Sequence, residues 1–209
     1  HSVVQLQVTL SSRKCVISAG LDPVLPPPLA DLALRYAGTR NYDLITEPCM
    51  TIRSDRFPNG VAWAPDGNII IAYYYGSMEL VDYKSGKTLL KKGDVWGDPG
   101  SVKVLKDGTI LVGSREDCCA MTPGVAFLSP DFTLQSSLVN AAPHVFGACA
   151  GIAVDEAHNM LVVTCNLTNQ IVLLKLKERE FVRYLGTRHT FHEPTGVCFN
   201  RKGQVAVCD

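Results

Sequence analysis

The feature of this sequence that most constrains its fold is an internal repeat. Four segments share one pattern: residues 58–72, 99–113, 150–164 and 194–208. Each segment reads as a short alternating strand, a turn that carries Gly or Asn, and a second apolar strand. A unit of this kind buries its apolar side chains only against neighbouring copies, as in solenoids and propellers. The repeat therefore predicts a tandem array of short antiparallel sheets.

The turns of the four copies are hairpin turns. Asp-Gly pairs at 66–67 and 107–108 are strong signals for two-residue turns, because such turns need positive φ angles that Gly and Asn tolerate. Asn159 and Gly203 occupy the same place in the other two copies.

The spacing of the copies indicates a propeller. The equivalent positions Val61, Val102, Ile152 and Val197 lie 41, 50 and 45 residues apart, which fits four-stranded blades of about 40–50 residues. A second hairpin follows the first in each complete copy, and no helical periodicity lies between them. We therefore predict an all-β fold, a β-propeller of four-stranded antiparallel blades.

We expect residues 1–209 to form a single propeller domain. Residues 1–20 read as an outer hairpin, and residues 187–209 supply only two strands, so the two ends could complete one shared blade. In that case residues 3–10 would pair with residues 204–208 and leave no free edge. The alternative is that the two ends are arbitrary cuts in a longer chain.

Residues 21–56 interrupt the repeat. They contain a proline-rich loop and a helix-leaning stretch at residues 29–35, so we interpret them as an irregular insertion or a degraded blade. The array then offers four blades, or five with this segment. A six-bladed propeller needs more residues than this sequence has. In that case the sequence would be a fragment of such a propeller.

Composition narrows the class of protein. Hydrophobic residues make up 46% and charged residues 19% of the chain, which excludes a disordered chain. No apolar run reaches the ~18 residues of a membrane helix, so we expect no membrane insertion. The formal net charge is zero, from 20 basic and 20 acidic residues. The net charge therefore does not indicate a nucleic-acid partner, although it does not exclude one.

The eight cysteines read as reduced, structural thiols. Most lie in strand-like apolar runs, where a thiol behaves as a small hydrophobe. Their spacing matches no zinc finger. We assign the chain to the cytoplasm.

Residues 56–72 and 191–209 resemble the NHL repeat, with a phenylalanine, a Pro-x-Gly-Val motif, a Gly turn and an apolar strand. The resemblance covers residues 56–209, together with residues 1–20 as an outer hairpin, and implies a propeller. Asp209 supplies the acid that ends this strand in the family, whereas Tyr73, Ser114 and Cys165 replace it in the other copies. These departures leave room for a related propeller of the gluconolactonase or strictosidine-synthase type.

The resemblance implies that two sets of loops emerge on one face, where we expect a protein partner to bind. The predicted binding residues are Tyr73, Tyr75, Trp96, Arg115, Glu116, His144, Phe146, Asn166 and His192. Aromatic and Arg side chains are typical of interface hot spots. The opposing interpretation is that Trp96, Phe57 and Phe146 pack between blades. At least one side chain of residues 73–75 must also point inward.

Two other functions stay open. A gluconolactonase-like, metal-dependent hydrolase would use Glu193, Asn59, Asp98, Asn166 and Asp209 as candidate ligands, although each also suits a turn or a strand end. An RNA-binding NHL propeller is the second alternative. No nucleophile elbow, phosphate loop or dinucleotide motif is present in the sequence, so we assign no catalytic residue, metal or cofactor. We favour a binding scaffold over an enzyme.

Overall fold

The computed structural model describes residues 5–11, 14–16, 50–53, 56–114, 123–138, 146–187, 189–200 and 202–209. The chain divides into two compact units, His1–Asp55 and Arg56–Asp209. The described helices are two 3-10 turns of three residues each, so the predicted all-β class is confirmed. None of them has the length and apolar character needed to cross a bilayer.

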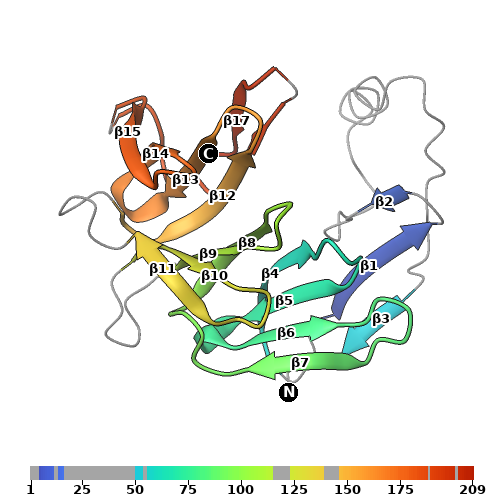
Figure 1. Cartoon of the computed structure of the whole chain (residues 1–209). Coiled ribbons are helices and arrows are strands. Elements are labelled where there is room, and N and C mark those ends of the chain that lie inside the picture. Colours follow the sequence, from blue (N-terminus) through green and yellow to red (C-terminus); the bar gives the residue numbers. More distant parts are fainter. Residues whose placement is uncertain are drawn as a thin grey trace, which may run out of the picture. The chain divides into compact units, whose positions relative to one another are not determined.

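The second unit contains three complete four-stranded antiparallel blades (Figure 1). The first blade consists of β4 to β7: Pro58–Trp63, Ile69–Tyr73, Met78–Val81 and Thr88–Lys92. The second blade consists of β8 to β11: Pro99–Val104, Ile110–Ser114, Val125–Leu128 and Leu134–Leu138. The third blade consists of β12 to β15: Cys149–Asp155, Met160–Cys165, Gln170–Lys175 and Glu180–Leu185. A two-stranded sheet follows, formed by β16 and β17: Val197–Phe199 and Val205–Val207.

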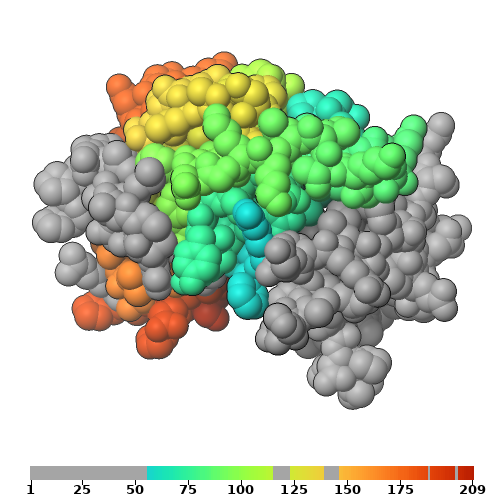
Figure 2. Space-filling view, turned by 90° about the horizontal axis from the view of Figure 1, so that it is seen from below, coloured from blue at the N-terminus to red at the C-terminus, as the bar shows by residue number. Residues whose placement is uncertain are grey.

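The first strands of successive blades lie side by side. β4 contacts β8, β8 contacts β12, and β12 contacts β16. The fourth strands β7 and β15 are largely exposed. The space-filling view shows the second blade between the first, in cyan to green, and the third, in orange (Figure 2). The predicted propeller of four-stranded blades is therefore confirmed, with three complete blades among the described residues.

Each blade contacts the next through side chains of alternate residues. In β9, Ile110 and Val112 belong to the core between the first two blades. Leu111 belongs to the core between the second and third blades. Gly113 faces the same way, since a Cβ built on it would lie 3.1 Å from the Ile152 side chain. Successive side chains of a strand point to opposite faces, so one strand serves two cores.

Burial on both faces explains the continuous apolar runs of the second and third strands. Every residue of β5, β9 and β10 is buried. A half-exposed sheet would instead show alternating polar residues.

The first hairpin turn differs from the predicted two-residue turn. Ala64 N donates to Asn68 O at 2.9 Å, and Gly67 N donates to Ala64 O at 2.9 Å. Only Gly67 of the Asp-Gly pair has a positive φ, of 86°. These bonds define a three-residue loop that ends in a left-handed residue. Asn159, with a φ of 56°, takes the equivalent position in the third blade, as predicted.

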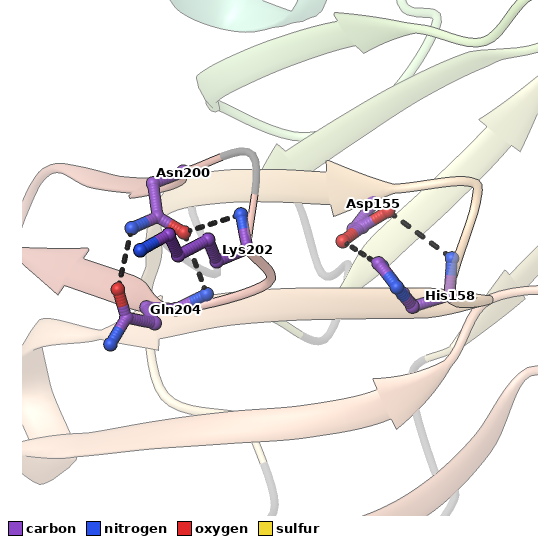
Figure 3. Close-up of polar contacts among 5 residues, drawn as sticks. All are labelled: Asp155, His158, Asn200, Lys202 and Gln204. Atoms are coloured by element: carbon purple, nitrogen blue, oxygen red, sulfur yellow. Dashed lines mark hydrogen bonds and ion pairs between the residues drawn. The ribbon is translucent and has the colours of Figure 1, made fainter.

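Short polar side chains fix these turns from within (Figure 3). The Oδ1 atom of Asn200 accepts hydrogen bonds from the backbone N–H groups of Lys202 at 2.9 Å and Gln204 at 3.0 Å. In the third blade, Asp155 Oδ2 lies 2.7 Å from His158 Nδ1. The hydrogen bond from His158 lowers the pKa of Asp155. Turns of this kind hold their backbone without tertiary contacts.

The first unit contains one described sheet, with strand order β2-β1-β3. Its strands are Gln5–Ser11, Lys14–Val16 and Met50–Arg53. The hairpin predicted for residues 1–20 is present as β1 and β2. The predicted pairing of residues 3–10 with 204–208 would join the two units and stays a prediction; within their own units, Gln5 to Val8 pair with β3 and β17 pairs with β16. Residues 17–49 lie outside the described residues, so the insertion, the helix-leaning stretch and the blade count stay predictions.

The close approach of two sheets leaves no room for a side chain at Gly151. A Cβ at this position would overlap the carbonyl oxygen of Thr195 in the next sheet. We expect Gly151→Ala to destabilise the chain by about 1–3 kcal/mol, lowering the melting temperature by roughly 2–4 °C per kcal/mol. Gly93→Ala is the matched control, because nothing lies within 4 Å of its added Cβ. Equal melting temperatures for the two variants would contradict the inter-blade contact.

The turn of the third blade predicts an acid-sensitive contact. Because the folded pKa of Asp155 is lowered, the contact stabilises the fold above the unfolded pKa and is lost as pH falls through the folded value. In an NMR titration, the Asp155 carboxyl should titrate below its ordinary value of 3.8. His158→Ala should raise this midpoint, and an unchanged midpoint would show that the ring does not hold the carboxylate.

Candidate functional site

The loop face, as we define it, is formed by the loops that precede each first strand and by those between the second and third strands. Two of the latter loops are 3-10 turns: Tyr74–Gly76 in the first blade and Asn166–Thr168 in the third. A left-handed residue lies within the first turn, Tyr75 with a φ of 65°, and directly after the second, Asn169 with a φ of 53°. The two turns follow the second strand at the same point of the repeat.

Tyr75 is the most exposed aromatic side chain in the described part of the chain, at 67%. Its ring meets the ring of Tyr74 edge to face, with centroids 4.4 Å apart. Tyr74 N donates to Phe57 O at 2.8 Å, which fixes the turn beside the entry of β4. The Phe57 side chain is 52% exposed. Two aromatic side chains of the first blade therefore face solvent on neighbouring loops.

Leu167 provides the equivalent group in the third blade. It is the middle residue of its 3-10 turn, as Tyr75 is in the first blade, and it is 73% exposed. The sequence reasoning missed Leu167 and named its neighbour Asn166. Alignment of the residues two positions after β5 and β13 would have found it, because Tyr75 and Leu167 stand at the same point of their repeats.

Tyr73 is buried rather than presented to a partner. Its side chain is 1% exposed, and its hydroxyl donates to Glu79 Oε2 at 3.2 Å. Lys91 Nζ lies 2.7 Å from the other oxygen of Glu79. Tyr73 ends the buried strand β5 and belongs to a polar network inside the first blade, so the prediction of an exposed binding side chain is corrected here. One residue of 73–75 points inward, as expected.

Trp96 is also buried, at 5% exposure. It packs in the core between the first two blades, with Val102 and Met78, and its indole Nε1 has no hydrogen-bond partner among the described residues. The position of Trp96 therefore agrees with the interpretation that it packs between blades. Phe146 is partly buried against the core between the second and third blades.

The remaining described candidates lie in the loops of the third blade and in the chain that follows it. His192 is exposed, and its backbone N–H donates to Asp209 Oδ1 at 2.6 Å. The Glu193 N–H donates to Asn169 Oδ1 at 2.8 Å. The backbone N–H of Asn166 donates to Ala148 O at 3.3 Å. Arg115, Glu116 and His144 lie outside the described residues.

The predicted metal ligands are only partly brought together. Asn59 Nδ2 donates to Asp98 Oδ1 at 3.1 Å, and Asp98 is 2% exposed. Asn59 is the extra residue of a bulge at the start of β4. In the part of the chain that the structure describes, no three His, Cys, Asp or Glu side chains gather as metal ligands. Asn59 and Asp98 therefore form a polar pair at the loop face.

Two buried cysteines lie opposite each other in the third blade. Cys149 and Cys165 lie opposite each other in β12 and β13, are fully buried and form no disulfide. The hydrogen bond to Cys165 and burial raise the pKa of the Cys149 thiol. The same hydrogen bond lowers the pKa of Cys165, and both side chains belong to the core between the second and third blades.

Comparison with known proteins identifies the fold and no family. No protein-family model and no curated protein matches the sequence. The structure is similar to Kuenenia stuttgartiensis hydrazine synthase, with a TM-score of 0.60 and 19% identity, over 79% of this chain and 45% of that one. It is also similar to the crystal structure of RRP9 WD40 repeats, with a TM-score of 0.55 and 16% identity, over 74% of this chain and 48% of that one. The chain thus spans less than half the length of either structure.

Trp96 gives a direct test of these assignments. Truncating a buried aromatic side chain typically costs about 3–5 kcal/mol, so Trp96→Ala should strongly lower the free energy of unfolding in a denaturant titration. Tyr75→Ala, on the exposed turn, should change it by no more than about 0.5 kcal/mol. If Trp96→Ala had wild-type stability, Trp96 would not be a core residue, and its assignment to the loop face would stand.

Proposed function

We propose that the chain is a protein-binding scaffold whose loop face recognises its partner through Tyr75, Leu167 and Phe57. The observation that supports this most is the exposure of Tyr75 and Leu167, at 67% and 73%, on equivalent turns of two blades. An apolar side chain held in water at one repeated position is unfavourable for the free chain, unless a partner covers it.

The backbone of this face is suited to binding without large rearrangement. Tyr74 is held by the carbonyl of Phe57, and Val95 N donates to Gly76 O at 2.8 Å. A partner then meets side chains whose loops are already ordered, which lowers the entropic cost of association. Tyrosine also buries a large area at small loss of rotamer freedom.

The finer parts of this proposal rest on the sequence. Arg115, Glu116, His144 and His192 complete the proposed face, and the NHL type is the kind of propeller we propose. The equal numbers of basic and acidic residues favour a protein partner over an RNA, since RNA binding usually draws on a basic surface.

The proposal predicts a selective loss of binding. The partner is first captured by crosslinking to the wild-type chain and purified, and its Kd is then measured by titration. The double variant Tyr75→Ala, Leu167→Ala should lose about 2 kcal/mol or more of binding free energy, as hot-spot truncations do. Its melting temperature should stay that of the wild type, because both side chains are exposed.

Leu89→Ala is the matched control. Leu89 is an exposed aliphatic side chain, at 55%, on the outer strand β7. Its loss should leave the Kd unchanged. Equal Kd values for the double variant and the wild type would show that the loop face is not the binding site. Hydrolysis of a lactone by the purified chain, abolished by EDTA, would instead establish the metal-dependent hydrolase.

A further inference from the structure

Two cysteines of the last sheet, which consists of β16 and β17, are exposed to solvent. Cys198 belongs to β16 and Cys208 directly follows β17, and both thiols are free. The interpretation of the cysteines as small hydrophobes suits the buried Cys149 and Cys165, but it does not suit these two. Neither of them is among the proposed binding residues of the loop face.

Both thiols lie on the same face of this sheet. Cys198 pairs with Ala206, and the Cys208 N–H donates to Gly196 O at 2.8 Å. Paired residues of an antiparallel ladder share a face, as do residues two apart on one strand, so Cys198, Ala206 and Cys208 lie together. The opposite face packs against the third blade through four apolar residues: Val197, Phe199, Val205 and Val207.

The three complete blades have no thiol at the equivalent positions. These positions hold Ala62, Lys103 and Ala153 for Cys198, and Ala72, Gly113 and Thr164 for Cys208. Strand pairing in the blades therefore does not depend on a thiol at either position.

The spacing of the two cysteines is too long for a disulfide and suits a bridging ion. They are diagonal neighbours across the two strands, and the Cα atoms of such residues lie about 7–8 Å apart. A disulfide usually joins Cα atoms no more than about 6.8 Å apart. Two metal–sulfur bonds of about 2.3 Å each span up to about 4.6 Å, which covers the gap that remains when the two thiols turn toward each other.

The side chains around the thiols leave space for an ion. Gly196 has no side chain and Ala206 has only a methyl group. The Cys208 Sγ already leans over β16, where it lies 3.4 Å from the position that a Cβ on Gly196 would take. Thiolate is a ligand that Cu(I) prefers, and two sulfurs can complete its coordination. A structural Zn²⁺ site takes four ligands instead.

We propose that Cys198 and Cys208 together bind one Cu(I) ion on the exposed face of the last sheet. Each thiol gives its proton to solvent as its Cu–S bond forms, and neither copper nor sulfur changes its oxidation state. The ion connects β16 to the chain that follows β17, so binding should stabilise this hairpin.

The test measures how fast each cysteine of the full chain is alkylated. The reduced, metal-free protein is treated with iodoacetamide in the absence of air, with and without one equivalent of Cu(I), and mass spectrometry identifies each labelled cysteine. Cu(I) should slow the alkylation of Cys198 and Cys208 by about tenfold or more, because a metal-bound sulfur is a poorer nucleophile than a free thiolate. In Cys208→Ser, Cys198 should react at its metal-free rate even when Cu(I) is present.

Ala206→Ser is the matched control, because it changes the same face and keeps both thiols. Cu(I) should protect both cysteines in this variant as in the wild type, and Zn²⁺ at the same concentration should protect them far less. Slow alkylation of either cysteine in the metal-free protein would show that the face is covered and would overturn the proposal. Protection of Cys198 in Cys208→Ser, or protection of other cysteines alone, would also overturn it, and equal protection by Zn²⁺ would rule out a site selective for Cu(I).

Discussion

Apolar contact between neighbouring blades is the interaction on which the rest of the structure depends. The strands β9 and β13 contribute alternate side chains to two different cores: Leu111 and Val163 to the core between the second and third blades, and Val112 and Val162 to the cores on either side. The hydrogen bonds of a sheet satisfy its backbone but do not join it to the next sheet. Interdigitated side chains supply this joining, through burial of apolar area that favours folding by ~25 cal/mol per Å².

Interlocking of this kind limits which residues can serve function. A strand residue in the middle of a blade has no free face, so the surface available for recognition is confined to the two ends of the strands and the outer edge. Tyr73 illustrates the limit. It lies two residues from Tyr75, yet it ends a buried strand and is 1% exposed, whereas Tyr75 lies on the turn that follows and faces water.

The sequence was sufficient for the architecture and insufficient for the site. Repeat spacing and turn residues predicted the blades, because a period near 45 residues and Gly at positive φ are local signals. The burial of Trp96 could not be read in this way. An aromatic residue in a loop suits an interface and an inter-blade core equally well, and only the position of Val102 and Met78 around it decides. The pairing of β1 with β3 is a contact of long sequence separation that no local pattern specifies, and the exposure of Leu167 depends on a 3-10 turn equivalent to that of Tyr75.

The bulges at the start of the inner strands have a further consequence. Three of these strands have a register shift at the same point, which leaves Asn59, Gly100 and Ala150 without a directly paired residue on the next strand. A bulge leaves one residue outside the ladder and re-aims its side chain. The three positions carry an amide, a hydrogen and a methyl group in otherwise equivalent strands, so side-chain chemistry differs from blade to blade at this point while the strand pairing stays the same.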